Sequence, residues 1–237
     1  MKIIDPMIEV EKYDGIKIMK NIEKACRTCY RSEGNITEDS YKNLLKNCIN
    51  KGHESVLEHE KITVRMVCDI GVYKDLTRHR FGSFSIESTR YCAYDKDRFG
   101  GELVFIQPIF FSPLPNDPED QNLPETREQM ITIDWFEAMY AVENSYLGMR
   151  SAGATPDECR MILPHSTAAE VVMTANIREW KHILELRANS HAHPAIQQLL
   201  IPLLLKFKKD MPEIFDDVNY NENFDKNKYA KLTIMKD

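Results

Sequence analysis

The chain has 237 residues, of which 43% are hydrophobic and 29% charged, and its formal net charge is −6. This composition is typical of a globular protein with a sizeable core, and the acidic balance argues against a nucleic-acid polymer as partner. No apolar run approaches the roughly 20 residues that a membrane span needs, and the N-terminus lacks the apolar region of a signal peptide. We therefore expect a cytoplasmic protein with no membrane partner.

Hydrophobic periodicity predicts helices and strands along the whole chain. In order, we expect a strand over 1–12, helices over 15–31 and 38–51, a strand over 61–68, a helix over 71–79, a strand over 103–111, a polar connection over 113–124, a helix over 125–149, a short helix over 156–164, and helices over 176–190 and 194–207. The segment 166–174 fits either a strand or a helix. We expect one α/β (α+β) domain over 1–215, with a central, mainly antiparallel sheet flanked by helices, and a polar C-terminal tail over 216–237.

Cap signals mark three of these boundaries. Gly52 stands where a left-handed residue would end the second helix. Residues 155–158, Thr-Pro-Asp-Glu, form a capping box with proline at the first helical position. Asn176, followed three residues later by Glu179, predicts the start of a further helix.

The cysteines and histidines do not form a convincing metal site. Six cysteines follow no disulfide rhythm, so we expect buried thiols in a reducing compartment. Cys26 and Cys29 make half of a zinc site, but they fall inside a helical pattern, which favours core packing over a metal or redox role. His191 and His193 have no third ligand at useful spacing. No metal is expected.

Residues 78–91 gather cationic and hydroxyl side chains within an acidic protein. Arg78, Arg80 and Arg90 offer planar forks of donors that suit phosphate, and three serines add short neutral donors. The alternative is a solvated basic loop. Aromatic residues interleave the charges, and a solvated loop has no need of them, so an anion-binding loop is favoured.

A second unusual arginine lies on the helix predicted after Asn176. The apolar stripe of that helix runs through Trp180, Ile183 and Leu184 and then reaches Arg187 and His191. Burying a guanidinium costs several kcal/mol unless an anion or acceptor meets it. Either an acidic residue elsewhere in the chain forms a salt bridge with Arg187, or a ligand provides the partner.

Three motifs resemble those of flavin-dependent thymidylate synthases. Arg78-His79-Arg80 is followed after seven residues by Ser88, with Ser83 and the Arg90-Tyr91 pair also in register. Residues 186–192, Leu-Arg-Ala-Asn-Ser-His-Ala, resemble the second signature, and Arg160 to Pro164 resembles the Arg-x-x-Leu-Pro segment. The resemblance covers most of residues 1–210 and implies a methyltransferase that assembles into a homotetramer, whose phosphate-holding loop comes from a neighbouring subunit.

The activity that this resemblance implies is the reductive methylation of dUMP to dTMP, for de novo dTMP synthesis. The methylene donor would be 5,10-methylenetetrahydrofolate, and NADPH would supply reducing equivalents through FAD. The chain has no Gly-x-Gly-x-x-Gly turn, so side chains would have to meet the FAD pyrophosphate. Two alternatives remain: another flavin-dependent enzyme that modifies pyrimidine nucleotides, or a nucleotide-sensing or RNA-binding protein without catalysis.

The resemblance also assigns site residues. FAD would be held by His53, Ser55, Arg78, His79, Arg80, Phe81, Glu87, Asn176, Arg178 and His182. The nucleotide dUMP would be held by Asp75, Arg78, Glu87, Ser88, Thr89, Arg90, Arg160 and Arg187, with its phosphate near Ser88, Arg90 and Arg160. Arg187 is the expected catalytic residue, because its guanidinium would stabilise negative charge on the pyrimidine.

Two other candidate catalytic residues are less suitable, and some positions depart from the family. Cys92 is near the basic cluster, but core packing is favoured over a nucleophilic role, and Ser88 has no suitable neighbouring base. The chain departs from the common family pattern at Asp75, Ser85, Glu87 and His182.

Overall fold

The computed structural model describes residues 1–111 and 126–236, which form two compact units. Unit 1 contains Met1–Pro6, Val67–Lys74 and Ile86–Val171, and unit 2 contains Met7–Met66, Asp75–Ser85 and Val172–Asp237. Within the described residues, no helix combines the length and apolarity needed to cross a membrane.

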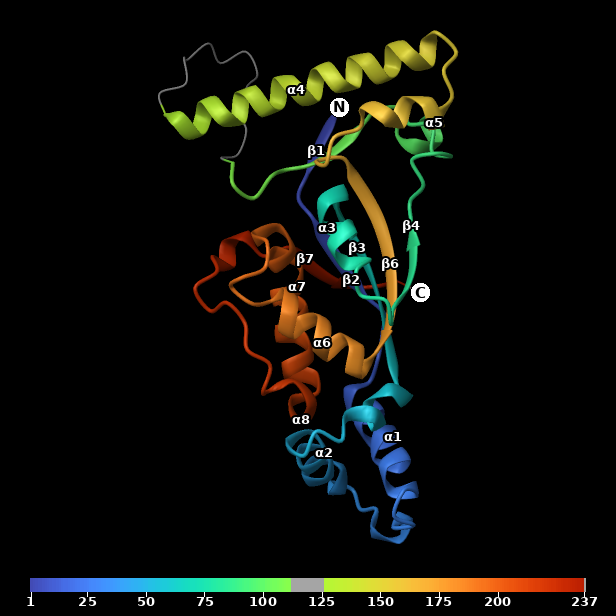
Figure 1. Cartoon of the computed structure of the whole chain (residues 1–237), viewed down its shortest axis with the longest axis vertical. Helices are drawn as coiled ribbons and strands as arrows, with labels where there is room; N and C mark the ends of the chain where they lie inside the picture. The colour runs from blue at the N-terminus through green and yellow to red at the C-terminus, as the bar shows by residue number, and fades with distance from the viewer. Residues whose placement is uncertain (112–125, 237) are drawn as a thin grey trace. The chain divides into compact units, whose positions relative to one another are not determined.

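The described part of the chain contains both strands and helices (Figure 1). The strands are β1 (Lys2–Ile4), β2 (Met7–Val10), β3 (Lys61–Asp69), β4 (Ser83–Ile86), β5 (Val104–Ile106), β6 (Ala168–Asn176) and β7 (Lys231–Ile234). The α-helices are α1 (Gly15–Thr28), α2 (Ser40–Asn50), α3 (Ile70–Leu76), α4 (Arg127–Ser151), α5 (Pro156–Cys159), α6 (Ile177–Arg187), α7 (Pro194–Asp210) and α8 (Pro212–Phe215). Short 3-10 turns are η1 (Glu33–Asn35), η2 (Glu54–His59), η3 (Asp97–Phe99), η4 (Arg160–Ile162) and η5 (Lys226–Lys228).

The described strands form two sheets. A five-stranded sheet has the order β4-β6-β3-β2-β7, and β1 and β5 form a two-stranded sheet. β2 pairs with β7 in parallel, Met7 opposite Lys231, and β1 pairs with β5 in parallel. The five-stranded sheet is mixed, because it includes the parallel pair of β2 and β7. The prediction of a mainly antiparallel sheet was therefore wrong. Long helical connections separate the paired segments in the sequence, and such connections permit parallel pairing.

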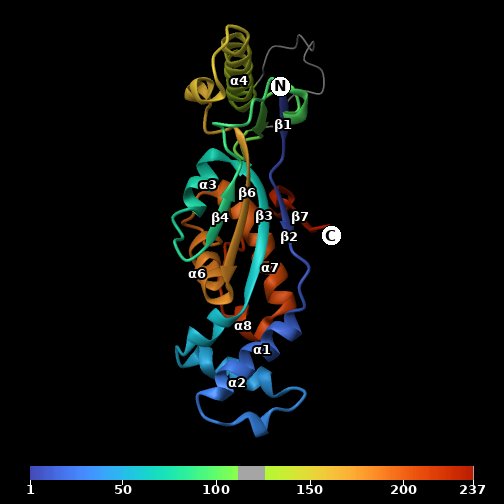
Figure 2. The ribbon, with the colours of Figure 1, turned by 90° about the vertical axis from the view of Figure 1, so that its right-hand side faces the viewer.

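The core of unit 2 lies between the sheet and the helices α6 and α7 (Figures 1 and 2). Side chains of β3 alternate between buried and more exposed positions, as its apolar–polar alternation predicts. Trp180 of α6 is fully buried, and its indole Nε1 donates a hydrogen bond to the carbonyl of Ile62 at 2.9 Å. This bond ties α6 to the central strand and fixes which face of α6 is turned outward.

The core of unit 1 is smaller and includes a buried carboxylate. Its central side chains are Tyr94, Leu103, Phe105, Met139, Tyr146 and Cys159. Glu143 of α4 lies beside this cluster, where it accepts a hydrogen bond from the amide of Leu103 at 3.0 Å and pairs with the N-terminal ammonium of Met1 at 2.7 Å. The chain start is thereby fixed to α4.

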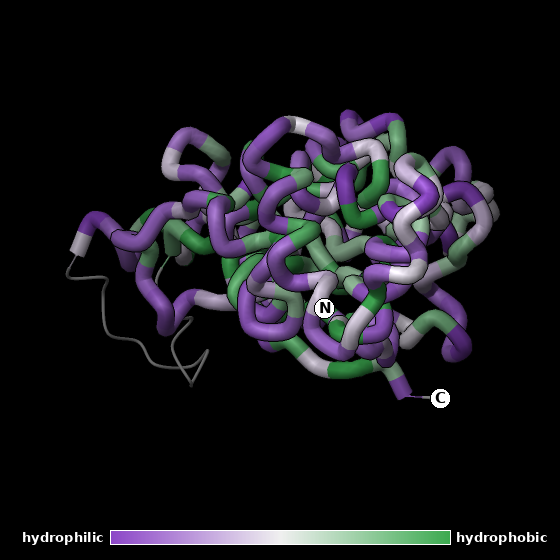
Figure 3. The backbone as a smooth tube through the Cα atoms, turned by 90° about the horizontal axis from the view of Figure 1, so that it is seen from below, coloured by the Kyte–Doolittle hydropathy of each residue, from purple (hydrophilic) through white to green (hydrophobic). Residues whose placement is uncertain are grey.

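Along the backbone, hydrophobic and hydrophilic residues alternate through many short segments (Figure 3), as amphipathic elements require.

Most predicted elements are present. The helices predicted over 15–31, 38–51, 71–79, 125–149, 156–164, 176–190 and 194–207 correspond to α1 through α7, and 166–174 belongs to strand β6. Gly52 has a φ of 71°, so the left-handed end of the second helix is confirmed. The capping box of Thr155 and Glu158 is present. The predicted connection over 113–124 lies outside the described residues.

Several boundaries differ from the predictions for local reasons. The strand predicted over 1–12 is interrupted at Pro6, which has no amide hydrogen for a ladder, and the strand predicted over 103–111 ends at Ile106. Strand β4 replaces part of the loop predicted after Arg80, and β7 lies in the polar tail. Helix α6 ends at Arg187 instead of 190, where the amide of His191 donates to the side chain of Asn189 at 3.1 Å.

Candidate functional site

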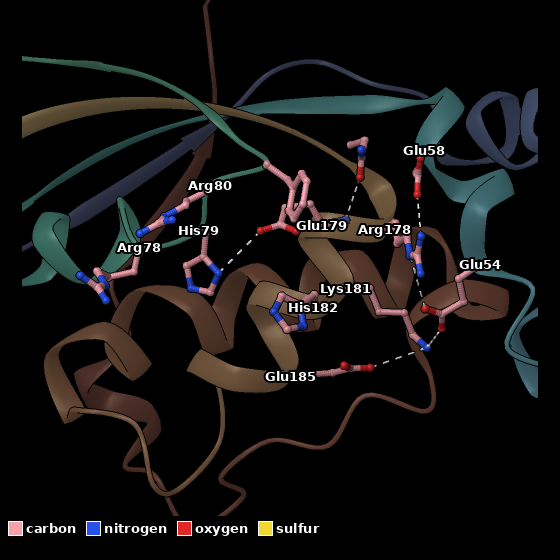
Figure 4. Close-up of a pocket in the computed structure, with 12 residues that line it drawn as sticks. Glu54, Glu58, Arg78, His79, Arg80, Arg178, Glu179, Lys181, His182 and Glu185 are labelled. Carbon is pink, nitrogen blue, oxygen red and sulfur yellow. Dashed lines mark hydrogen bonds and ion pairs between the residues drawn. The ribbon is translucent and has the colours of Figure 1, made fainter.

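A pocket of about 640 Å³ opens in unit 2, within the size range of small-molecule sites. Its walls come from η2, from the turn after α3 and from the first turns of α6 (Figure 4). The side chains that line it are Glu54, Glu58, Arg78, His79, Arg80, Phe81, Asn176, Arg178, Glu179, Lys181, His182 and Glu185. Ten of these twelve residues are ionisable, so the pocket suits a charged ligand with several polar groups.

The turn that carries Arg78, His79 and Arg80 begins where α3 ends. The amide of His79 donates to the carbonyl of Leu76 at 3.1 Å, and the amide of Gly82 donates to the carbonyl of His79 at 3.4 Å. This tight turn separates the three side chains. His79 is buried, with 6% of its surface exposed, whereas the two arginines are exposed.

Arg187 meets His79 inside unit 2. Its Nε donates to His79 Nε2 at 3.0 Å, and its Nη2 donates to the backbone carbonyl of Asp75 at 3.2 Å. Both acceptors are neutral groups, so these two bonds do not offset the charge of the guanidinium. One alternative from the sequence was a salt bridge between Arg187 and an acidic side chain. The two bonds above go instead to a histidine ring and to a backbone carbonyl. Arg187 is half-buried and not fully buried, and His191 is exposed beyond the end of α6.

The environment of His79 keeps its ring neutral. Burial, then the charge of Arg187, then the nearby His182 lower the pKa of His79 from its ordinary value of 6.5 to about 4. The rings of His79 and His182 are 6.0 Å apart between centroids. On the other side of the ring, Nδ1 lies 3.7 Å from Oε1 of Glu179, a residue with only 7% of its surface exposed. Burial raises the pKa of Glu179.

A network of ion pairs lies at the other end of the pocket. Arg178 Nη1 lies 2.6 Å from Oε1 of Glu58. The ammonium of Lys181 lies 3.1 Å from Glu54 Oε1 and 2.8 Å from Asp217 Oδ2, although only 4% of Lys181 is exposed. Burial alone would lower the pKa of Lys181, but the hydrogen bonds to Asp217 and Glu54 outweigh burial and raise it. Sequence reasoning missed this network, although the four-residue spacing of Lys181 and Glu185 was visible.

Unit 1 holds a second, exposed arginine cluster. Ser88 begins a turn in which the amides of Tyr91 and Cys92 donate to its carbonyl at 3.0 Å. The Nε of Arg90 lies 3.1 Å from Oδ1 of Asp157, and the Nε of Arg160 lies 3.0 Å from the same oxygen. The two arginines predicted at the phosphate therefore converge on one carboxylate. Asp157 was missed as a partner, because the capping box explained its presence at the start of α5.

Two further residues of unit 1 were considered in the sequence analysis, Glu87 as a site residue and Cys92 as a nucleophile. Glu87 accepts a hydrogen bond from the hydroxyl of Tyr94 at 2.8 Å and lines a smaller cavity of about 190 Å³. Burial, and next the charge of Glu87, raise the pKa of Cys92. A raised pKa disfavours the thiolate form, which agrees with the packing role that the sequence favoured for Cys92.

The sequence-predicted residues thus fall into two groups. In unit 2, the pocket collects Arg78, His79, Arg80, Phe81, Asn176, Arg178 and His182, and Arg187 and Asp75 join this group through His79 and the backbone. Unit 1 contains Glu87, Ser88, Thr89, Arg90 and Arg160. His53 and Ser55 are exposed at the start of η2 and do not line the pocket. Within residues 1–111 and 126–236, no three potential metal ligands lie together.

Comparison with known proteins identifies the family. A family model described as thymidylate synthase complementing protein matches residues 16–213. The flavin-dependent thymidylate synthase of Mycobacterium avium is 29% identical over 206 residues, covering 83% of this chain and 78% of that protein. The enzyme of the same name from Halobacterium salinarum is 30% identical over 210 residues, covering 84% of this chain and 83% of that protein.

A solved structure shows the same fold. The crystal structure of a UMP/dUMP methylase PolB from Streptomyces cacaoi bound with 5-Br dUMP has a TM-score of 0.71 at 21% identity, covering 91% of this chain and 96% of that chain. The resemblance inferred from the three motifs is confirmed by the family model and by these relatives. The chain belongs to the thymidylate synthase complementing protein family.

Proposed function

We propose that this protein is a flavin-dependent thymidylate synthase, which converts dUMP, 5,10-methylenetetrahydrofolate, NADPH and a proton into dTMP, tetrahydrofolate and NADP⁺. The observation that carries the proposal is Arg187, whose guanidinium donates to two neutral acceptors beside a pocket of about 640 Å³. A cation that is held in place without a neutralising partner suits a substrate on which negative charge develops. The family of the chain and the names of its relatives support the same conclusion.

The pocket residues fit FAD. Arg78 and Arg80 expose planar donor forks that suit a pyrophosphate, and Phe81, 81% exposed, offers an aromatic face at the rim. Asn176 uses its side-chain oxygen to cap α6, where it accepts from the amide of Glu179 at 2.8 Å, and this bond does not use its side-chain nitrogen. When bound, FAD supplies the redox chemistry, taking electrons from NADPH and providing a hydride for the transferred carbon.

Arg187 acts on the pyrimidine. Methyl transfer to C5 of uracil requires electron density at that carbon, and the negative charge is delocalised onto the oxygen O4, which lies beside the ring nitrogen N3. Donors of Arg187 that face these atoms stabilise this charge, and the bonds to His79 and Asp75 hold the guanidinium in position beforehand. We propose that Asp75 faces the sugar or the edge of the base, and we assign the same role to Glu87 of unit 1, from a neighbouring subunit.

Ser88, Thr89, Arg90 and Arg160 hold the phosphate of dUMP. Arg90 and Arg160 already converge on Asp157, so their guanidinium groups lie close enough to share one anion. We place this cluster in the active site of a neighbouring subunit of a homotetramer, so an isolated monomer should be inactive. Size-exclusion chromatography with light scattering tests the assembly, and an active monomeric species would contradict it. The enzyme acts in the cytoplasm, in keeping with its six free cysteines.

The proposal is tested by tritium release. Purified protein is incubated with 5-tritiated dUMP, methylenetetrahydrofolate and NADPH, with and without FAD. We expect release of tritium to water and formation of dTMP only when FAD is bound. A protein that stays colourless when incubated with FAD, and that releases no tritium, would instead be a non-catalytic nucleotide-binding protein.

A further inference from the structure

The buried imidazole of His79 has polar neighbours at both ring nitrogens. Arg187 Nε lies 3.0 Å from Nε2. On the other side, Glu179 Oε1 lies 3.7 Å from Nδ1 (Figure 4). His79 and Glu179 are 6% and 7% exposed, so little water reaches either group. Glu179 is part of α6, whereas His79 belongs to the turn after α3. Their contact therefore connects two elements that both line the pocket.

The donor at Nε2 favours one position of the ring proton. A guanidinium has only donors, so Nε2 of His79 must present its lone pair to Arg187, and the proton of a neutral ring must then be on Nδ1. A buried Nδ1–H needs an acceptor, and the carboxylate that faces it is that of Glu179. Without this acceptor, the buried Nδ1–H would be unpaired, so the tautomer with its proton on Nδ1 would lose its advantage over the tautomer with its proton on Nε2.

The same bonds determine which edge of Arg187 remains for a ligand. Nε and Nη2 together form the side edge of the guanidinium, and this edge faces His79 and the carbonyl of Asp75. These two bonds do not use the end edge, which is formed by Nη1 and the second hydrogen of Nη2. An edge of two parallel donors matches two adjacent acceptor atoms on a planar ring.

We propose that Glu179 is a positioning residue, which keeps the proton of His79 on Nδ1 so that Nε2 accepts from Arg187 and the end edge of the guanidinium faces the substrate. The catalytic part of this inference rests on the proposed function, whereas the proton position on His79 does not. Glu179 contacts His79 and acts through that ring.

Three variants separate this role from a general effect of losing a buried carboxylate. Glu179→Leu removes the acceptor and replaces the carboxylate with an apolar side chain that still fills the buried site. Glu179→Gln retains an acceptor oxygen. Glu23→Gln is the matched control, because Glu23 is a buried carboxylate of unit 2, 1% exposed and paired with Arg27, that does not line the pocket. Circular dichroism confirms that each variant is folded.

The first measurement is the nitrogen NMR spectrum of His79 in the protein without nucleotide. We expect a neutral ring with the proton on Nδ1 in the unsubstituted protein, in Glu179→Gln and in Glu23→Gln, and a mixture of tautomers in Glu179→Leu. A ring of Glu179→Leu that stays wholly in the Nδ1–H form overturns the proposal. So does a ring of the unsubstituted protein that carries its proton on Nε2.

The second measurement is tritium release from dUMP. Glu179→Leu should lower kcat about tenfold, the scale of leaving one buried donor without an acceptor, while the flavin absorption spectrum stays unchanged. Glu179→Gln should stay within about threefold of the unsubstituted enzyme, and Glu23→Gln should not change kcat. Equal losses in the Gln and Leu variants overturn the positioning role. If the unsubstituted protein releases no tritium, the proposed function fails, and the NMR measurement still decides the tautomer of His79.

Discussion

The two arginine clusters differ in what holds them. In unit 1, Arg90 and Arg160 are 53% and 41% exposed, and both pair with the carboxylate of Asp157. In unit 2, Arg187 is half-buried and donates to the ring of His79 and to a backbone carbonyl. One cluster is neutralised in part by an acidic residue and open to water, whereas the other keeps its charge beside neutral acceptors.

This difference suits two different tasks. Exposed ion pairs contribute only about 0–1 kcal/mol to stability, so an incoming phosphate can displace Asp157 from the arginines at little cost. A guanidinium held by neutral groups keeps its full charge for a transition state. We therefore expect substitutions at Arg187 to affect kcat and substitutions in the exposed cluster to affect the KM for dUMP.

The largest expected effect is that of Arg187→Leu. Losing the donors that face the pyrimidine should lower kcat about 100- to 1,000-fold, the range for removal of one preorganised donor, while the protein keeps its fold and its yellow colour. The control is Arg187→Lys, which keeps the charge but loses the planar fork. Its kcat should lie between that of Arg187→Leu and that of the unsubstituted enzyme. Tritium release measures both. Turnover of Arg187→Leu close to that of the unsubstituted enzyme would refute the catalytic role.

The next effect is the pH dependence of stability that His79 contributes. Its pKa is about 4 in the folded protein and 6.5 ordinarily, so the unfolded chain takes up the proton first as the pH falls. The contribution is complete above pH 6.5, is lost as the pH falls toward 4, and amounts to about 3 kcal/mol in the free energy of unfolding. Urea unfolding at several pH values across this window gives the free energy of unfolding of the unsubstituted protein and of His79→Gln. A plot of this free energy against pH should have a shallower slope for the variant. Identical slopes would mean that His79 is not held neutral.

Arg160→Ala should have a smaller effect, confined to substrate binding. Removing one of two charged donors to the phosphate should raise the KM for dUMP about tenfold and leave kcat nearly unchanged. The increase should shrink at high ionic strength, because salt screens exposed charges. A variant with an unchanged KM and a lower kcat would place Arg160 at the reacting atoms and not at the phosphate.

The smallest expected effect is that of Asp157→Asn. The pair is half-exposed, so the free energy of unfolding should change by less than about 1 kcal/mol. Because the carboxylate competes with the phosphate for both arginines, its removal should lower the KM for dUMP by about threefold at most. Steady-state kinetics at low salt would reveal the change. An increase in KM would instead indicate that Asp157 prepositions the two arginines.

Sequence reasoning identified both clusters but not their partners. Arg187 and the Arg78-His79-Arg80 turn were visible as motifs, and helical spacing gave the buried face of Trp180, Ile183 and Leu184. The acceptors of Arg187 belong to another element, and no local spacing shows which elements meet. Glu179 had a sufficient local explanation as the third residue of α6, so its contact with His79 was missed. Strand direction was missed because apolar–polar alternation is the same in parallel and antiparallel sheets.

The division of tasks between the two clusters is tested most directly by removing the phosphate from the substrate. Tritium release from 5-tritiated dUMP and from 5-tritiated deoxyuridine is compared for the unsubstituted enzyme, Arg160→Ala and Arg187→Lys. We predict that the effect of Arg160→Ala on kcat/KM disappears with deoxyuridine, whereas the effect of Arg187→Lys is the same for both substrates. If both effects persist with deoxyuridine, or if that of Arg187→Lys disappears, the assignment of the clusters is wrong.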